Sequence, residues 1–439
     1  MFTTLKNAFK IKEIRNKLLF TLGMLVVIRL ASQLPVPGTN SSVIQQIFSS
    51  NVSDAFNFFN AFTCGSFTSF SIAALNITPY ITASIIIQLL TIAIPKLEEL
   101  QKDGENGKKI LASITRYVTV ALALVEAAAM TIAFGNQGLL EDKNVLGYIT
   151  AIIALTAGSA FFMWIGERIN EKGVGNGISV VLVINIVSTI PQDIVGLFSQ
   201  FVVNRDIAPA ILNSIIIVAV LIALIVLIVL LNSGVRKIPV QYAKKMQGRK
   251  MVGGSSTNIP LKINTSGVIP VIFASSLMQF PVVICSFFGI TGNKDSVWGH
   301  ILLGLNSSNW CNFKDPVYSI GLVVYIALVI FFAYFYTSIT FNPMEVSENM
   351  KKQGGFIPGI RPGKPTSEYL TRILNSIIFI GAVGLTIVCI IPFFFKGIFN
   401  VQVSFAGTSL IIVVSVIVET IKQIESQMLV RNYKGFLND

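Results

Sequence analysis

Charged side chains are scarce in this sequence. Only 12% of the 439 residues are Asp, Glu, Lys or Arg, whereas 53% are hydrophobic. An average soluble domain contains about 25% charged residues. The chain has too little charge to cover a water-exposed surface, so the composition excludes a soluble globular domain and indicates a polytopic membrane protein.

Cysteine is rare as well, and no two cysteines have CxxC spacing. The four are Cys64, Cys285, Cys311 and Cys389. Two of them lie inside apolar runs. Metal sites and disulfide frameworks depend on regular spacing, so we interpret these cysteines as small buried hydrophobic residues.

Residues that would support catalysis are also missing. The one histidine, His300, has no evident nucleophile or metal partner in its segment, and we interpret it as an ordinary loop residue. The stretch GENGKK at 104–109 lacks the earlier glycine and the Ser or Thr of a phosphate-binding loop. We therefore predict no enzyme and no cofactor, and energy for any transport must come from a partner.

What is present is a series of apolar runs, each close to the roughly 20 residues that a membrane-spanning helix needs. The first begins at Leu18 and ends in LPVPG, without the small-residue cleavage site of a targeting signal, so we interpret it as a span. We predict ten spans: 18–36, 76–95, 117–135, 147–166, 177–198, 211–232, 267–289, 317–340, 373–392 and 407–427.

Lys and Arg are unevenly distributed between the connecting segments. With a cytoplasmic N-terminus, 27 lie in cytoplasmic segments and 5 in outer ones, while Arg29 lies inside the first span. Positive charge is retained on the cytoplasmic side, so we expect cytoplasmic termini, an amphipathic one at 1–17 and a tail at 428–439. The two halves, 18–200 and 201–427, would then run in opposite directions, as in an inverted repeat.

The outer segment before the second span ends in the apolar stretch FTCGSFTSFSIAAL, residues 62–75. This stretch is too short to cross the membrane. It is either a re-entrant helix or plug, which needs surrounding protein or a water-filled cavity, or an amphipathic helix on the outer surface. The residues alone favour neither.

Four spans place polar residues about two turns from aliphatic ones on the same helix face. The four faces are Ile77, Ile81, Ser84 and Gln88; Ile178, Leu182, Asn185 and Thr189; Ile272, Ser275, Ser276 and Gln279; and Thr408, Ile412, Ser415 and Glu419. In any one span, such polar groups are typical of hydrogen bonds between packed helices. Their recurrence in four spans favours a polar conduit that is closed by an apolar belt.

Two cytoplasmic segments, 233–265 and 341–372, are too long to be simple connectors. The first has seven basic residues and no acidic one. In the second, PGIRPGKP places Arg361 between Pro and Gly turns that would present it rigidly. The charge is either an orientation signal or a docking surface for an acidic or phosphate-rich partner, and the length favours docking. No nucleic-acid-binding module is apparent, so any RNA contact would be by charge.

Several motifs resemble the SecY family of protein-translocation channels. They are SIAALNITPYITASIIIQLL, GERINEKGVGNGIS, VQYAKKMQGRKMVGGSSTNIPLKINTSGVIPVIFASS, NPMEVSENMKKQGGFIPGIRPGKPT and FAGTSLIIVV. The resemblance extends in order over residues 15–435. It implies an all-α membrane protein with ten transmembrane helices, arranged in two pseudo-symmetric inverted halves of five around a central hourglass pore.

The resemblance also implies roles for individual residues. The family's aliphatic pore ring falls on Ile77, Ile81, Ile178, Leu182, Ile272 and Ile412. Its plug helix falls on residues 62–75, and its lateral gate, between spans two and three and spans seven and eight, would include Gln88 and Phe280. Ala406 stands where a second Gly is expected, and Leu182 replaces an Ile but keeps the ring apolar.

The implied function is the central channel subunit of the Sec translocon of a bacterial plasma membrane. Unfolded polypeptides would cross the membrane through the ring, and hydrophobic segments would leave sideways into lipid. Arg249, Lys250 and Arg361 fall in the family's docking loops for the SecA ATPase or the ribosome. SecE and SecG subunits, preprotein signal sequences and membrane lipid are the other implied partners.

One internal charge keeps a second function class open. Glu126 lies in the third predicted span, where an ionisable residue in a transporter would be a proton or cation site. In a channel it lines the cavity or gate, which is the interpretation we favour. Stabilisation of the protein by a small solute or ion would support a secondary transporter instead.

Overall fold

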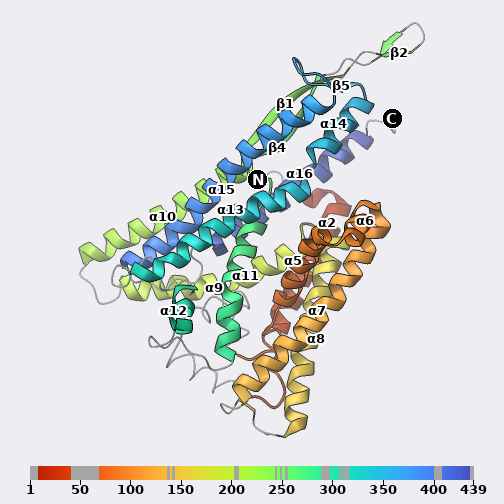
Figure 1. Cartoon of the computed structure of the whole chain (residues 1–439). Helices are drawn as coiled ribbons and strands as arrows, with labels where there is room; N and C mark the ends of the chain where they lie inside the picture. The colour runs from red at the N-terminus through yellow and green to blue at the C-terminus, as the bar shows by residue number, and fades with distance from the viewer. Residues whose placement is uncertain are drawn as a thin grey trace.

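A computed structural model shows the chain as an elongated helical bundle with a small sheet at one end (Figure 1). It describes residues 8–40, 69–135, 139–140, 144–201, 207–242, 245–247, 250–252, 256–287, 297–305, 310, 316–399 and 408–435.

Each of the ten predicted spans coincides with a long helix. These are α2 (Lys12–Ala31), α5 (Thr78–Ala93), α7 (Gly104–Gly135), α8 (Val145–Lys172), α9 (Gly177–Phe201), α10 (Ile207–Ser233), α11 (Ile269–Phe287), α13 (Ile320–Thr340), α15 (Lys364–Phe399) and α16 (Thr408–Gly435). By length and composition, five helices in the described chain qualify on their own as membrane spans, and a bent helix pair makes a sixth. The prediction of an all-α polytopic membrane protein is confirmed.

The bent pair is α5 with α6 (Pro95–Lys102), whose axes differ by 103°. The bend follows from Pro95, because a proline disfavours helical backbone in the residue before it. Ile94 is accordingly extended, with φ −112° and ψ 112°. Helix α5 therefore stops at Ala93, and α6 continues at a steep angle to it.

The segment before α5 differs from the predicted helix at 62–75. Residues 69–77 form turns, and Phe70 and Asn76 have the positive φ values 44° and 50°. Left-handed backbone interrupts an α-helix, so a helix here cannot extend through residues 69–75; residues 62–68 lie outside the described chain. The turns are nevertheless inside the protein, since Phe70, Ser71 and Ala74 are fully buried.

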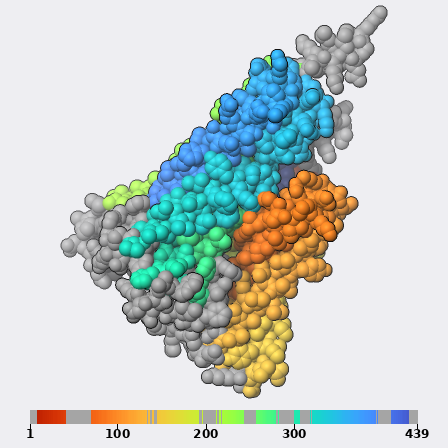
Figure 2. All heavy atoms as spheres, viewed as in Figure 1, coloured from red at the N-terminus to blue at the C-terminus, as the bar shows by residue number. Residues whose placement is uncertain are grey.

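The two halves of the chain meet on two sides. On one side α9 packs against α10 and α16, and on the other α7 contacts α11. Figure 2 shows the orange part of the first half lying against the blue, teal and green part of the second. The largest apolar cluster of the described chain includes residues of α5, α8 and α9 from the first half and of α10, α11, α13, α15 and α16 from the second.

The two long segments that were predicted to be cytoplasmic fold together as one unit, at the end of the molecule where α16 ends (Figure 1). Strands β1 (Val235–Tyr242) and β4 (Ser256–Lys262) pair antiparallel, and β5 (Gly355–Phe356) joins the other edge of β1. Strands β2 (Lys245–Gln247) and β3 (Lys250–Val252) form a separate ribbon at the tip.

An apolar core holds the three-stranded sheet to α15 and to the short helix α14 (Pro343–Lys352). It consists of Ile238, Val240, Leu261, Met350, Ile357, Leu370, Ile373 and Ile377. We call the three-stranded sheet, the β2–β3 ribbon, α14 and the turn between β5 and α15 the docking unit, after the role predicted for these segments. Two further elements, α12 (Val297–Leu305) and the 3-10 helix η2 (Pro316–Ser319), precede α13.

Candidate functional site

The six predicted ring residues all belong to the largest apolar cluster. Ile77, Leu182, Ile272 and Ile412 are buried members, and Ile81 and Ile178 pack against them at partial exposure. They come from the start of α5 and from α9, α11 and α16, so both halves contribute. An apolar constriction built from four helices repels water and ions.

Local sequence fixes where the first ring residue lies. Asn76 adopts a left-handed conformation, which Asn tolerates better than most residues, and its side-chain oxygen accepts a hydrogen bond from the backbone N–H of Ile77 at 2.8 Å. Pro79 stands in the first turn of α5, where its missing N–H costs nothing. Helix α5 therefore begins at the level of the ring.

The polar residues of the four faces lie on both sides of the ring. Because successive spans alternate in direction, spans two and ten run opposite to spans five and seven. Residues that follow the ring in α5 and α16, such as Gln88 and Ser415, therefore lie on one side of it. Those that follow it in α9 and α11, such as Asn185 and Ser275, lie on the other. Across the membrane, the predicted apolar ring therefore has polar residues on each side.

Their hydrogen bonds divide these residues into two groups. Ser415 accepts a bond from Asn232 of α10 at 2.6 Å, and Ser275 and Thr189 donate to their own helices, as packing residues do. The Oε1 atom of Gln88 and the Nδ2 atom of Asn185 are buried without a partner among the described residues. A buried amide that lacks a partner costs free energy, so a hydrogen-bond partner would stabilise each of these two groups.

The predicted gate helices are adjacent across the seam between the halves. Helix α7 packs on α5 in the first half, α11 packs on α13 in the second, and α7 contacts α11. Gln88 lies on α5 at partial exposure. Phe280 belongs to α11, and its side chain lies outside the described part.

The three predicted docking residues have different surroundings. Arg361 is exposed and lies between Gly359 and Gly363, whose φ values are +84° and +101°. Thr366 donates to the carbonyl of Arg361 at 2.8 Å, and Ser347 of α14 donates to the carbonyl of Gly363 at 2.8 Å. This turn is therefore fixed from both sides. Lys250 begins β3, and Arg249 lies outside the described residues.

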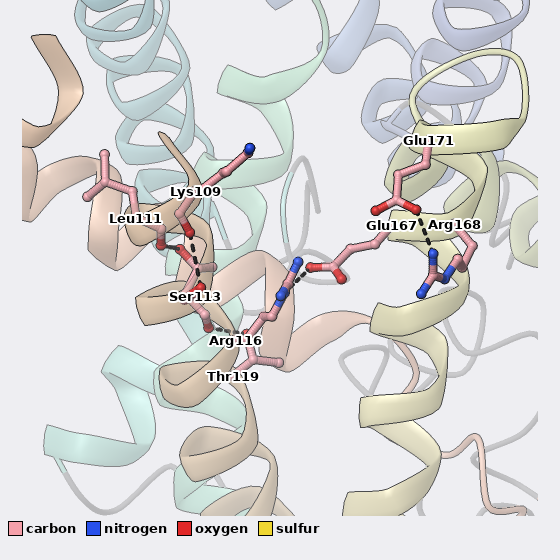
Figure 3. A network of polar contacts seen from close by, with 9 residues as sticks. Lys109, Leu111, Ser113, Arg116, Thr119, Glu167, Arg168 and Glu171 are labelled. Atoms are coloured by element: carbon pink, nitrogen blue, oxygen red, sulfur yellow. Dashed lines mark hydrogen bonds and ion pairs between the residues drawn. The ribbon is translucent and has the colours of Figure 1, made fainter. Parts of the chain in front are cut away.

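A charged cluster between α7 and α8 was not predicted from the sequence (Figure 3). Arg116 of α7 forms an ion pair with Glu167 of α8 at 2.7 Å. Arg168 pairs with Glu171 at 2.7 Å, and its guanidinium lies 5.6 Å from the ring centroid of Trp164. Only the Arg168 and Glu171 pair has a sequence signal, a spacing of three residues on one helix.

Within the described chain, no group of three or more His, Cys, Asp or Glu residues could hold a metal ion. Cys389 is buried and Cys285 partly buried, and both are free thiols. His300 is exposed in α12. None of these residues forms part of the ring or its polar flanks.

This fold and this arrangement define a polytopic membrane channel. The chain belongs to the SecY family, whose family model matches residues 71–421. It is similar over 100% of both chains to proteins described as protein translocase subunit SecY, with 43% identity to that of Halalkalibacterium halodurans and 42% to that of Bacillus subtilis. The family is one of translocation channels rather than enzymes, in agreement with the prediction from the sequence.

Solved structures have the same fold. A structure described as a protein conducting channel covers 94% of this chain and 92% of its own, with a TM-score of 0.63 and 20% identity. Sec61 in a canine ribosome-channel complex also covers 94% of this chain and 92% of its own, with a TM-score of 0.63 and 18% identity. These likenesses support the ten-helix arrangement in two halves around a central pore.

Proposed function

We propose that the ring of Ile77, Ile81, Ile178, Leu182, Ile272 and Ile412 is the seal through which this chain conducts unfolded polypeptides. The observation that carries the proposal is the convergence of these six residues, from four helices of both halves, in one apolar cluster. Aliphatic side chains fit around any sequence without specific hydrogen bonds, and they exclude water when the channel is empty.

The buried turns at 69–75 and the preceding residues 62–68 would block the channel as a plug when no substrate is present. The seam between α7 and α11, with Gln88 and Phe280 on the adjoining gate helices, would open towards lipid. A hydrophobic segment would leave there because burying apolar surface in lipid gains about 25 cal/mol per Å².

The docking unit would bind the partner that supplies energy, either the SecA ATPase or the ribosome. Support comes from the rigid, exposed turn that carries Arg361 and from the basic β2–β3 ribbon. A relative of similar fold, Sec61, is described in a complex with a ribosome. SecE and SecG would complete the translocon in a bacterial plasma membrane, with both termini and the docking unit cytoplasmic.

Reconstituted vesicles containing the chain with SecE and SecG test the ring. Ile81→Asn should raise resting ion conductance, because one polar group hydrates an apolar constriction, and deletion of 62–75 should let defective signal sequences pass more readily. The matched control is Ile92→Asn, an exposed position on the same helix. Conductance that stays at the wild-type value in both ring and plug variants would contradict the proposed seal.

A further inference from the structure

A hydrogen-bonded junction lies between the docking unit and the ring helices, with Asn232 at its centre. The Nδ2 atom of Asn232 donates to Oγ of Ser415 at 2.6 Å, and its Oδ1 atom accepts from Nδ2 of Asn264 at 2.7 Å. Its backbone carbonyl accepts from Nζ of Lys422 at 2.9 Å. One residue at the end of α10 thus contacts α16 twice and the segment between β4 and α11 once.

The positions of these residues connect the two functional regions of the protein. Asn232 comes three residues before β1, and Asn264 two residues after β4, next to the Val235 and Lys262 pair that ends the sheet. On the other side, Ser415 lies one helical turn from Ile412, and Asn264 precedes α11, the helix of Ile272. The junction is thus within a few residues of the sheet, and on α16 within one turn of the ring.

The junction is partly buried and charged at one edge, and Asn232 and Lys422 are both partly exposed. Asn264 and Ser415 are each 7% exposed. Lys422 places a positive charge at the C-terminal end of α10, where helix carbonyls lack partners and attract cations. Access of water to Asn264 and Ser415 is therefore restricted. A shift of β1 and β4 would strain the hydrogen bonds that Asn232 makes with these two residues.

One polar atom of the junction lacks a hydrogen bond. The Oδ1 atom of Asn264 is buried and has no hydrogen-bond partner among the described residues. A buried acceptor without a donor is unfavourable, so this arrangement is not the one that satisfies every group. A rearrangement that gives Oδ1 of Asn264 a donor would lower the free energy of the junction.

We propose that Asn232 is a positioning residue that couples the docking unit to the pore ring through Ser415 and Asn264. This inference rests on the proposed function of both regions. Binding of the partner to the sheet would shift β1 and β4, and the junction would pass that shift to α16 and α11, which carry Ile412 and Ile272. Partner binding itself would not depend on the junction.

The test uses vesicles that contain the chain with SecE and SecG, and ribosomes that carry a secretory precursor. Ribosome Kd and the rate of precursor translocation are measured separately. For Asn232→Ala and Ser415→Ala we expect Kd within about twofold of wild type and a translocation rate about five- to tenfold lower. The double variant should be no slower than either single variant, within about twofold, because both remove the same link.

Two further variants separate coupling from mere structural support. Asn232→Asp keeps an acceptor for Asn264 and gains one for the hydroxyl of Ser415, so it should recover at least about half of the rate. Ser376→Ala removes an exposed serine that bonds only its own helix, and it should leave the rate unchanged. Ser415→Ala removes a single hydroxyl and carries the test if Asn232→Ala does not yield a monodisperse complex.

The outcomes distinguish this inference from the proposed function. A wild-type chain that neither binds ribosomes nor translocates would overturn the proposed function. A wild-type chain that translocates while Asn232→Ala and Ser415→Ala match it would overturn the coupling role alone. Additive losses in the double variant, or a Kd that weakens in proportion to the rate, would also overturn that role.

Discussion

Ile77 and Ile178 approach the same glycine, Gly166 of α8. A methyl group built on Gly166 would lie 3.5 Å from Cδ1 of Ile77 and 3.6 Å from Cγ1 of Ile178, both ordinary van der Waals distances. Both are predicted ring residues, one at the start of α5 and the other in α9. Helix α8 contributes none of the six predicted ring residues, yet its backbone sets the space available to two of them.

We predict that Gly166→Ala is tolerated and that Gly166→Leu opens the seal. The alanine methyl fits the observed distances, whereas a leucine side chain would displace Ile77 and Ile178. Resting conductance of reconstituted vesicles should rise for Gly166→Leu only. Gly23→Leu, at a position on α2 with open space around it, is the control. Equal conductance in the two leucine variants would show that Gly166 does not support the ring.

A second glycine holds the buried turns before α5. A methyl group on Gly158 of α8 would overlap the backbone carbonyl of Ile72, which cannot move aside as a flexible side chain could. We predict that Gly158→Ala displaces the turns at 69–77, lowers unfolding free energy by about 1–3 kcal/mol and raises resting conductance. Gly23→Ala is the control. An unchanged thermal midpoint for Gly158→Ala would contradict this.

The ten helices and the grouping of the ring residues could be predicted because both depend on patterns along single segments. Runs of about 20 apolar residues give the spans, and helical periodicity identifies most of the inward-facing aliphatic positions. All six predicted ring residues lie on the four faces identified in this way, and the resemblance to the SecY family adds their role. The structure brings all six residues into one cluster.

The docking unit and the junction could not be predicted in the same way, because they depend on contacts between distant segments. VRKIPVQY has the alternation of a strand, and Ile238 and Val240 are indeed buried on one face. Its partner β5, however, lies more than a hundred residues away. The bonds of Asn232 to Ser415 and Asn264 likewise have no local signal.

Arg361 should contribute to partner affinity without affecting the empty channel. We predict that Arg361→Ala weakens ribosome binding about tenfold, because an exposed guanidinium on a fixed turn loses little entropy when it binds phosphate or carboxylate groups. Resting conductance should stay at the wild-type value. Lys352→Ala, an exposed cation on α14, is the matched control and should have a smaller effect on Kd. Equal effects of the two variants on Kd would indicate that positive charge in general, and not the position of Arg361, determines ribosome affinity.

The predicted orientation can be tested with single cysteines in a background where the four native cysteines are replaced by serine or alanine. Glu348→Cys in α14 should react with a membrane-impermeant thiol reagent only from the cytoplasmic side. Asn144→Cys, just before α8, should react only from the outside. The prediction follows from the retention of positive charge in cytoplasmic segments. Labelling of both positions from the same side would contradict the predicted topology.

The ion pair between Arg116 and Glu167 should contribute little to stability despite its 2.7 Å length. Its side chains are 47% and 22% exposed, and solvent screens such pairs, so we predict that Glu167→Gln lowers unfolding free energy by about 0.5 kcal/mol. The difference should shrink at high salt. Glu171→Gln, which removes the more exposed pair with Arg168, should cost less. The thermal midpoint of the detergent-solubilised complex measures the effect of both variants. A loss of unfolding free energy above about 2 kcal/mol for Glu167→Gln would show that this pair holds α7 to α8 more strongly than its exposure implies.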